Sequence, residues 1–476
     1  MAALAANEQG ATFVGLDQLP EFGGTAIVSG GGMSIAGTSM QAEMDIVDSP
    51  DDAFRDLMAE DNNADPAWGR FYYDRVVNEL FEYLRGLGME YVQITISETD
   101  SVPRRHVPKR MGLGLMTTLH EAHKTRGIDD CWHQSMTAKD LIWEDGRVVG
   151  VLAEDEGGAP HEFRGHAVIL GTGGFTGNLP MVLKYSPRLA TLGKVLAGGG
   201  VGALGKGHEI LLRHGATIVN ADSFVVYVYA TPDYEDPKLE RGLVVRGVDH
   251  CIWVNGAGQR FHDEMQNGSI YGPPAVMSQD PPFCWAILDY DMASKIDVSD
   301  PRYRRGSDVI RDRIWEMLRD SPYVATGSTL RELAENAGFD AANFDQTVAA
   351  WNALLASGSE RDPQTNRELK GVAPLRDGPY FAMQFWPLAR KNQGGIRTDL
   401  QCRVVTATRD VIPGLYAAGE LCGFAGGHIS GRRAPEGIMI GGSLFSGRVA
   451  GAWAAHEAGH AEPSHLRADE AAVTRS

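Results

Sequence analysis

The first seventeen residues constrain the fold more than any other stretch of this chain. Small residues over Ala2–Asn7 predict a helix, and an apolar run over Thr12–Leu16 predicts a strand that ends at Asp17. In a dinucleotide-binding βαβ unit, an acidic residue at that strand end hydrogen-bonds the adenosine ribose hydroxyls. The stretch therefore predicts the second half of such a unit. The strand and the G-x-G-x-x-G turn of its first half do not occur before it in the sequence.

Four glycine-rich strings follow one another along the chain. They are FGGTAIVSGGGMSIAG, VILGTGGFTGN, GLYAAGELCG and GGSLFSGRVAG. Glycine has no Cβ, so such turns let backbone N–H groups come close to phosphates and to a ring system. The strings therefore predict tight turns that contact a nucleotide ligand.

In this order, the four strings resemble the FAD-binding family of fumarate reductase and succinate dehydrogenase flavoproteins. The same family includes tricarballylate-type and 3-ketosteroid dehydrogenases. The resemblance runs from residue 2 to about residue 458. It implies an α/β fold, in which a discontinuous Rossmann-like FAD-binding domain carries an inserted α+β capping domain.

The expected boundaries follow from a change of character along the chain. Residues 223–390 gain aromatics and prolines and lose the alternation of strands and helices, so we assign them to the capping domain. Residues 1–222 and 391–460 form the expected FAD-binding domain, and 461–476 a polar tail. The resemblance implies that one strand and one phosphate loop are missing ahead of Met1, which we interpret as an internal methionine of a longer chain.

FAD is the cofactor that the resemblance implies, and each matching position receives a role. Asp17 would hold the ribose of the AMP half. Ser443 and Leu444 would begin the last helix, whose N–H groups would face the flavin edge that gains negative charge on reduction. VSGGGMSIAG contains no histidine, so we expect FAD to be bound non-covalently. The positions expected to bind FAD are Asp17, Gly23, Gly24, Thr25, Ser29, Gly30, Gly31, Ala138, Thr172, Gly173, Gly174, Gly419, Glu420, Ser443 and Leu444.

The proton relay of the fumarate-reducing members is not reproduced in this sequence. Gly268 stands where those enzymes carry a proton-donating arginine, and Tyr229 replaces a substrate histidine. Either Arg390 or Lys391 would keep one positive group near the substrate.

The loop GHISGRRAPEG, residues 427–437, is the expected substrate anchor, because arginine forks suit carboxylates. A solvated basic loop is the alternative. The residues expected to take part in catalysis are Tyr227, Tyr229, Arg246, His262, Lys391, His428, Arg432 and Arg433.

We therefore expect an FAD-dependent oxidoreductase that desaturates or reduces a C–C bond next to a carbonyl or carboxylate. A tyrosine or histidine would take the α-proton of a small-molecule substrate. Small acids and steroid-like ketones are both candidate substrates, and the electron acceptor is unknown. Two alternatives remain: a fumarate-reductase-like enzyme with a relocated proton donor, and a flavin-free or truncated binding protein of this fold.

Composition narrows the partners and the location. A net charge of −18 weighs against nucleic acid as a partner. The sequence has neither a long apolar run nor a basic segment before one, so we expect a cytoplasmic protein without a membrane span. The five cysteines are far apart, which argues against a metal site. GGGVGALGKG, residues 198–207, resembles a P-loop only in part, because Gly207 stands where Ser or Thr would bind Mg²⁺. We expect a glycine turn there that leads into a helix over His208–His214.

Overall fold

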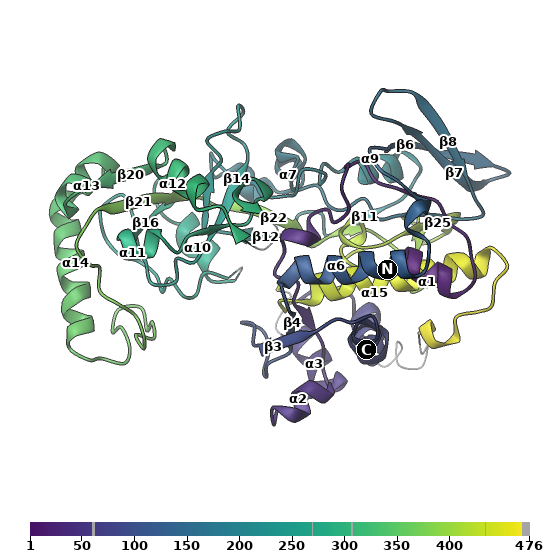
Figure 1. Cartoon of the computed structure of the whole chain (residues 1–476), viewed down its shortest axis with the longest axis horizontal. Helices are drawn as coiled ribbons and strands as arrows, with labels where there is room; N and C mark the ends of the chain where they lie inside the picture. The colour runs from purple at the N-terminus through teal and green to yellow at the C-terminus, as the bar shows by residue number, and fades with distance from the viewer. Residues whose placement is uncertain (60–61, 269, 306–307, 434, 469–476) are drawn as a thin grey trace. The chain divides into compact units, whose positions relative to one another are not determined.

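The structure is a computed structural model that describes residues 1–59, 62–268, 270–305, 308–433 and 435–468. The chain divides into two compact units (Figure 1). Unit 1 comprises Met1–Ser186, Gly199–Phe224 and Lys391–Ser476, and unit 2 comprises Pro187–Gly198 and Val225–Arg390. The chain therefore leaves unit 1 and returns to it twice.

Short parallel strands form the nucleotide-binding part of unit 1. Strand β1 (Gly15–Leu16) lies parallel to β5 (Trp132–His133), and is shorter than the predicted strand over residues 12–16. Strand β9 (Val168–Leu170) lies parallel to β25 (Val411–Ala417), whose other edge pairs with β24 (Arg403–Val405). The glycine-rich strings follow β9 and β25, so parallel pairing brings the carboxyl ends of these strands together.

An antiparallel meander projects from the same unit. It consists of β6 (Thr137–Glu144), β7 (Arg147–Glu154) and β8 (Pro160–Arg164), in that order. The predicted hairpin pair Asp145-Gly146 turns with φ of 48° and 77°, which is the left-handed turn that two-residue hairpins favour.

Two helices from opposite ends of the sequence pack together in unit 1. Helix α1 (Ala2–Glu8), predicted over residues 2–7, runs against α15 (Ile438–Glu457), and Figure 1 shows the two side by side. A Cβ at Gly451 would lie 2.8 Å from the carbonyl carbon of Ala2, so only glycine permits this approach. Arg448 of α15 then pairs with Glu8 and Glu79 at 2.8 and 2.7 Å.

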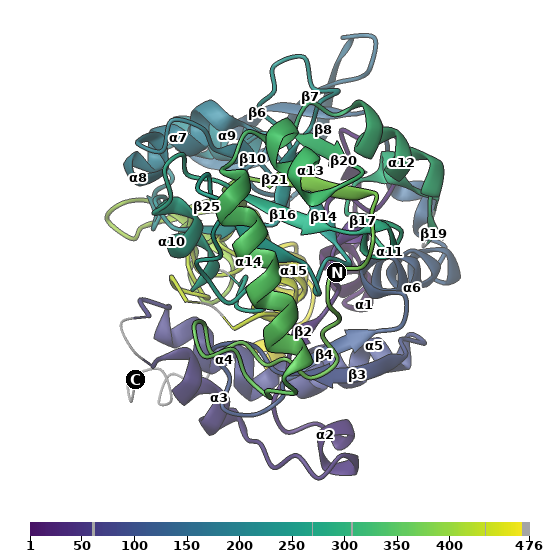
Figure 2. The same cartoon turned by 90° about the vertical axis from the view of Figure 1, so that its left-hand side faces the viewer.

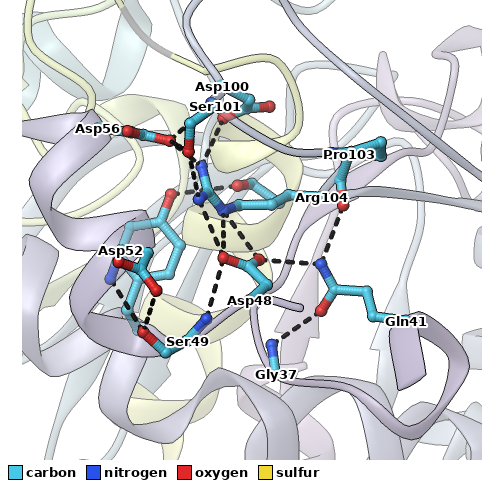
Figure 3. A network of polar contacts seen from close by, with 12 residues as sticks. Gly37, Gln41, Asp48, Ser49, Asp52, Asp56, Asp100, Ser101, Pro103 and Arg104 are labelled. Carbon is cyan, nitrogen blue, oxygen red and sulfur yellow. Dashed lines mark hydrogen bonds and ion pairs between the residues drawn. The ribbon is translucent and has the colours of Figure 1, made fainter. Parts of the chain in front are cut away.

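A buried charge cluster stabilises a second part of unit 1, the sheet β2 (Met33–Ser34), β4 (Arg105–Pro108) and β3 (Tyr91–Thr95). Arg104 has no exposed side-chain surface, and it pairs with Asp48, Asp56 and Asp100 (Figure 3). These acids lie on separate segments, so the one guanidinium joins the start of β4 to the segment that carries α3.

The remaining elements of unit 1 are mostly helical. They are α2 (Ser39–Glu43), α3 (Pro50–Leu57), α4 (Pro66–Val76), a π-helix (Val77–Glu82), α5 (Tyr83–Gly86), α6 (Met111–Thr125), α7 (Leu179–Tyr185), α9 (Lys206–Arg213), β11 (Ile218–Val219) and β23 (Gly395–Ile396).

Unit 2 is built on a four-stranded antiparallel sheet. Its strand order is β15 (Ile252–Val254), β16 (Cys284–Leu288), β21 (Tyr380–Phe385) and β20 (Val324–Gly327). Helix α13 (Leu330–Ala337) packs against β20 and β21 and against α14 (Ala341–Ala356), the long green helix of Figure 2. Trp253, Ile287 and Phe385 are buried in the core that results.

Smaller strands and helices complete unit 2. They are β10 (Leu196–Ala197), β12 (Phe224–Tyr227), β13 (Ala230–Pro232), β14 (Gly242–Arg246), β17 (Asp297–Val298), β18 (Arg304–Arg305), β19 (Asp308–Val309), β22 (Leu388–Asn392), α8 (Pro187–Ala190), α10 (Gly272–Met277), α11 (Tyr290–Ala293) and α12 (Arg311–Asp320). Strands β12 and β22 contain two of the four points at which the chain passes from one unit to the other. Among the described helices, none is both long and apolar enough to cross a membrane.

Candidate active site

Asp17 lies just beyond the carboxyl end of β1. Its backbone N–H donates to the carbonyl of His133 at 2.9 Å, and its carboxylate accepts from the N–H of Leu19 at 2.9 Å. Burial raises the pKa of the Asp17 carboxyl. The ionised group accepts several hydrogen bonds, so it has acceptor capacity left for the hydroxyls of a ribose.

Ser29 fixes the turn of the first glycine-rich string. Its hydroxyl donates to the carbonyl of Ala26 at 2.7 Å and accepts from the N–H of Gly31 at 3.1 Å. Gly31 has φ +64°, and a Cβ there would lie 2.6 Å from the carbonyl carbon of Met111, so glycine is required. At Gly24, in contrast, nothing lies within 4 Å of the Cβ position. Its backbone is therefore open to a ligand.

Asn392 joins the second and third strings. Its side chain accepts from the N–H of Phe175 at 3.1 Å and donates to the carbonyl of Glu420 at 3.1 Å. Its backbone N–H donates to the carboxylate of Glu420 at 3.2 Å. The side chain of Asn392 thus holds together two segments that are far apart in sequence, residues 174–175 and residue 420.

The string after β9 combines closed and open positions. A Cβ at Gly174 would lie 2.6 Å from the carboxyl carbon of Glu420, whereas Gly173 has nothing within 4 Å of its Cβ position. The hydroxyl of Thr172 is buried and has no hydrogen-bond partner among the described residues. An open backbone beside a partnerless hydroxyl is the arrangement that a polar ligand would complete.

Gly419 is anchored to α15 by Ser446. The Ser446 hydroxyl accepts from the N–H of Gly419 at 3.0 Å and donates to the carbonyl of Phe424 at 2.7 Å. This places the third string beside the last helix.

The expectation that Ser443 and Leu444 begin that helix is wrong. Helix α15 begins at Ile438 after Gly437, so Ser443 and Leu444 lie in its second turn. Glycines 441 and 442 do not interrupt the helix because both pack closely, Gly442 with its Cβ position 3.2 Å from the Cβ of Phe424. The N–H of Ile438 donates to the carbonyl of Pro435 at 3.3 Å, so the N–H groups of the first turn that can face a ligand are those of Met439 and Ile440.

The string over 198–207 lies against two segments expected to bind FAD. The side-chain amide of Gln18 donates to the carbonyl of Gly202 at 2.9 Å, and the Cβ position of Gly200 lies 3.3 Å from the Cβ of Thr25. The predicted glycine turn into a helix is confirmed, with α9 beginning at Lys206, two residues before the predicted start.

These features of unit 1 fit an FAD molecule. The open glycines, the hydroxyl of Thr172, the acid at Asp17 and the N-terminus of a 20-residue helix offer hydrogen-bonding and electrostatic partners for phosphates, ribose and a ring. Ala138 lies in β6 paired with Ala153, which matches its expected place on a strand.

The basic loop over residues 427–437, in unit 1, is the expected anchor of the substrate. Burial lowers the pKa of His428, and its Nδ1 is buried without a partner among the described residues. Arg432 is 60% exposed and lies 3.9 Å from Asp222, a weak surface contact. The backbone N–H of Arg433 donates to the side chain of Asn62 at 3.1 Å, which fixes the loop. Lys391 is half-buried and pairs with no acid in the described part of the chain.

Unit 2 brings only some of its expected residues together. The rings of Tyr227 and Tyr229 stack with centroids 4.8 Å apart. The carbonyl of Tyr229 accepts from the N–H of Val245, which places Arg246 on the adjacent strand, with its Nε buried and unpartnered within the described residues. The described contacts of His262 are with Gln266 and Trp253, and none of them involves either tyrosine.

The comparisons with known proteins agree with this geometry. A family profile described as an FAD binding domain matches residues 1–438. The chain belongs to this FAD-binding family. It is 28% identical to the urocanate reductase of Eggerthella lenta, over 95% of the chain and 72% of that protein. It is also 28% identical to a KsdD-like steroid dehydrogenase of Mycobacterium tuberculosis, over 96% of the chain and 94% of that protein.

A solved structure of the same FAD-binding family shows the fold. The open conformation of a flavocytochrome c3 fumarate reductase is 25% identical to the chain, with a TM-score of 0.75 over 96% of the chain and 76% of that protein. The expected fold class, an FAD-binding domain with an inserted capping domain, is confirmed. The expected FAD-dependent oxidoreductase class is confirmed as well.

Sequence reasoning missed three residues of this FAD-binding unit. Asn392 and Ser446 lie next to expected positions, yet no motif distinguishes an asparagine or a serine that bonds across the fold. Arg105 was missed because its contacts with Gly30 and Gly32 come from a strand more than seventy residues later in the sequence.

Proposed function

We propose that this flavoprotein binds FAD non-covalently and oxidises or reduces a C–C bond adjacent to a carboxylate or carbonyl. The observation that carries the proposal is the gathering of three glycine-rich strings in unit 1 through Asn392 and Ser446, with open backbone at Gly24 and Gly173. Bound FAD supplies the hydride acceptor or donor.

The loop over 427–437 anchors the substrate in this proposal. Arg432 and Arg433 offer planar forks that suit a carboxylate, and exposure leaves Arg432 free to rotate toward one. Lys391 adds a positive charge that no acid of the described residues neutralises.

His428 is the proposed proton acceptor for dehydrogenation. Burial lowers its pKa, so the imidazole is neutral at pH 7 and can accept a proton. Its Nδ1 lacks a partner among the described residues, which leaves one ring nitrogen for the substrate. In the direction of reduction, the same group returns the proton.

The visible absorption spectrum of the purified chain tests the proposal first. We expect a flavin spectrum, and acid precipitation should release the flavin into the supernatant because no covalent bond holds it. A colourless protein would refute the proposal, and flavin that stays in the pellet would refute the non-covalent part.

Anaerobic mixing then identifies the substrate class. The relatives' names direct the choice of compounds, namely urocanate, fumarate and 3-ketosteroids. Bleaching by a ketosteroid would indicate dehydrogenation. Reoxidation of the dithionite-reduced protein by fumarate or urocanate would indicate reduction, with a relocated proton donor in the case of fumarate.

A further inference from the structure

Arg104, which directly precedes strand β4, and Arg105, the first residue of that strand, point to opposite faces. Side chains alternate along a strand, so Arg104 and His106 point into the protein, where both are fully buried, and Arg105 points the other way, with 25% of its side chain exposed. The cluster of Arg104 with Asp48, Asp56 and Asp100 fixes the start of this strand (Figure 3). The direction of Arg105 is therefore set by its buried neighbour.

The guanidinium of Arg105 occupies the space that two glycines leave free. Its Nη2 lies 2.7 Å from the Cβ position of Gly30, and its Nε lies 2.5 Å from that of Gly32. A side chain at either position would displace the arginine. Gly30 and Gly32, on either side of Gly31, thus allow the positively charged guanidinium of Arg105 to lie against the segment expected to line the flavin.

The charge of Arg105 is only weakly balanced. Among the described residues its ion-pair partner is Glu436, at 3.5 Å, and that carboxylate is 49% exposed. Such long, half-exposed pairs contribute little and exchange readily with other anions. Glu436 also directly precedes Gly437 and the N-terminus of α15, whose N–H groups add positive potential.

We propose that Arg105 stabilises the negative charge that FAD gains on reduction, and that Glu436 moderates this effect. The inference rests on the proposed binding of FAD. A fixed cation beside a flavin favours the reduced form, and a neighbouring anion opposes it. Arg105 and Glu436 therefore set the reduction potential in opposite directions.

Two substitutions and a control test whether Arg105 and Glu436 shift the reduction potential in opposite directions. Arg105→Gln should make the midpoint potential, measured against reference dyes, more negative than that of the wild type. It should also weaken the affinity for sulfite, which adds a negative charge to the flavin, by about tenfold. Glu436→Gln should shift both quantities the other way. Arg55→Gln, at a side chain that is 72% exposed, should change neither.

The outcomes separate this inference from the proposed function. Absence of flavin from the wild-type protein would overturn both. Flavin-loaded variants with unchanged potentials, or with shifts of the same sign, would overturn the role of Arg105 alone. If Arg105→Gln loses its flavin, the Glu436→Gln variant tests the inference, because that substitution leaves Arg105 in place against Gly30 and Gly32. An unchanged midpoint potential in Glu436→Gln would then overturn the inference.

Discussion

The hydroxyl of Ser446 and the N–H of Gly419 meet at 3.0 Å inside unit 1, where Ser446 is fully buried. The same hydroxyl donates to the carbonyl of Phe424, so one small side chain satisfies a backbone group of the third glycine-rich string and one of the residue that follows it. The turn that would hold the flavin is thus tied to the interior of α15.

Ser446→Ala should loosen this turn. It leaves the buried carbonyl of Phe424 and the half-buried N–H of Gly419 without partners, which costs about 1–3 kcal/mol for the buried group, and FAD should dissociate faster. Urea unfolding and the rate of flavin release measure the two effects. Ser443→Ala, three residues away on the same helix, is the matched control for stability, since no side-chain hydrogen bond of Ser443 is found in the described contacts. Equal stability of the two variants would contradict the assignment to Ser446.

Gly174→Ala should remove flavin binding. The added Cβ would meet the carboxylate of Glu420 and the amide of Asn392, and relief of that overlap would shift both strings at a cost of about 1–3 kcal/mol. The flavin-to-protein ratio after purification measures the result. Gly171→Ala is the control, because nothing lies within 4 Å of its Cβ position, and it should retain flavin.

Arg104→Met should strongly destabilise unit 1. The substitution leaves Asp48, Asp56 and Asp100 without their common cation, and breaking a buried ion pair in this way costs about 3–5 kcal/mol. Urea unfolding at pH 7 measures the loss. The exposed Arg55→Met should stay within about 0.5 kcal/mol of the wild type.

The same cluster predicts opposite pH effects at two of its acids. Burial would raise the pKa of Asp56, but hydrogen bonds from Ser101 and Arg104 outweigh it and lower the pKa below 3.8. Asp56 therefore contributes stability above pH 3.8 that is lost as pH falls through its folded pKa. At Asp100 burial prevails and raises the pKa, so its contribution is present below pH 3.8 and is lost as pH rises.

Asparagine substitutions at Asp56 and Asp100 test this difference in how the two acids contribute to stability as pH changes. Asp56→Asn should destabilise the protein most at pH 7, and the difference from the wild type should shrink toward pH 3. Asp100→Asn should cost less than Asp56→Asn at pH 7. Unfolding curves across this range test the order, and a larger loss for Asp100→Asn at pH 7 would contradict it.

His428→Gln should reduce substrate oxidation without preventing flavin binding. Loss of a general base typically lowers kcat by about 10²–10⁴-fold. In the wild type, because burial lowers the pKa of His428, the oxidation rate should increase with pH, and the midpoint of that increase should lie below pH 6.5. Stopped-flow reduction of the flavin from pH 5 to 8 follows both changes. A variant that keeps wild-type rates would assign the proton to another group, with Tyr229 the next to substitute.

The sequence correctly predicted the elements that depend on local residue patterns. The helix at residues 2–8, the strands that end in glycines and the Asp145-Gly146 hairpin all follow from periodicity and turn chemistry. The start of α15 was mispredicted because glycines 441 and 442 look like helix breakers. Their role is to admit Tyr72 and Phe424, and that packing appears only in three dimensions.

The parts of the site that could not be predicted are contacts across the fold. Asn392 bonds to a residue more than two hundred positions earlier, and Arg105 rests on glycines from another segment. Neither contact leaves a local signature, because the residues that an asparagine or arginine meets are set by topology.

The discontinuity of unit 1 has a consequence for biosynthesis. Residues 225–390 of unit 2 leave the ribosome before Lys391–Ser476, which carry Asn392, Glu420 and the helix that packs on α1. Translation adds about 5–20 residues per second, so the early half of the nucleotide site waits many seconds for its partner. Cofactor loading is therefore among the last events in the maturation of this protein, and the nascent chain must keep its first glycine-rich segments available until translation is nearly complete.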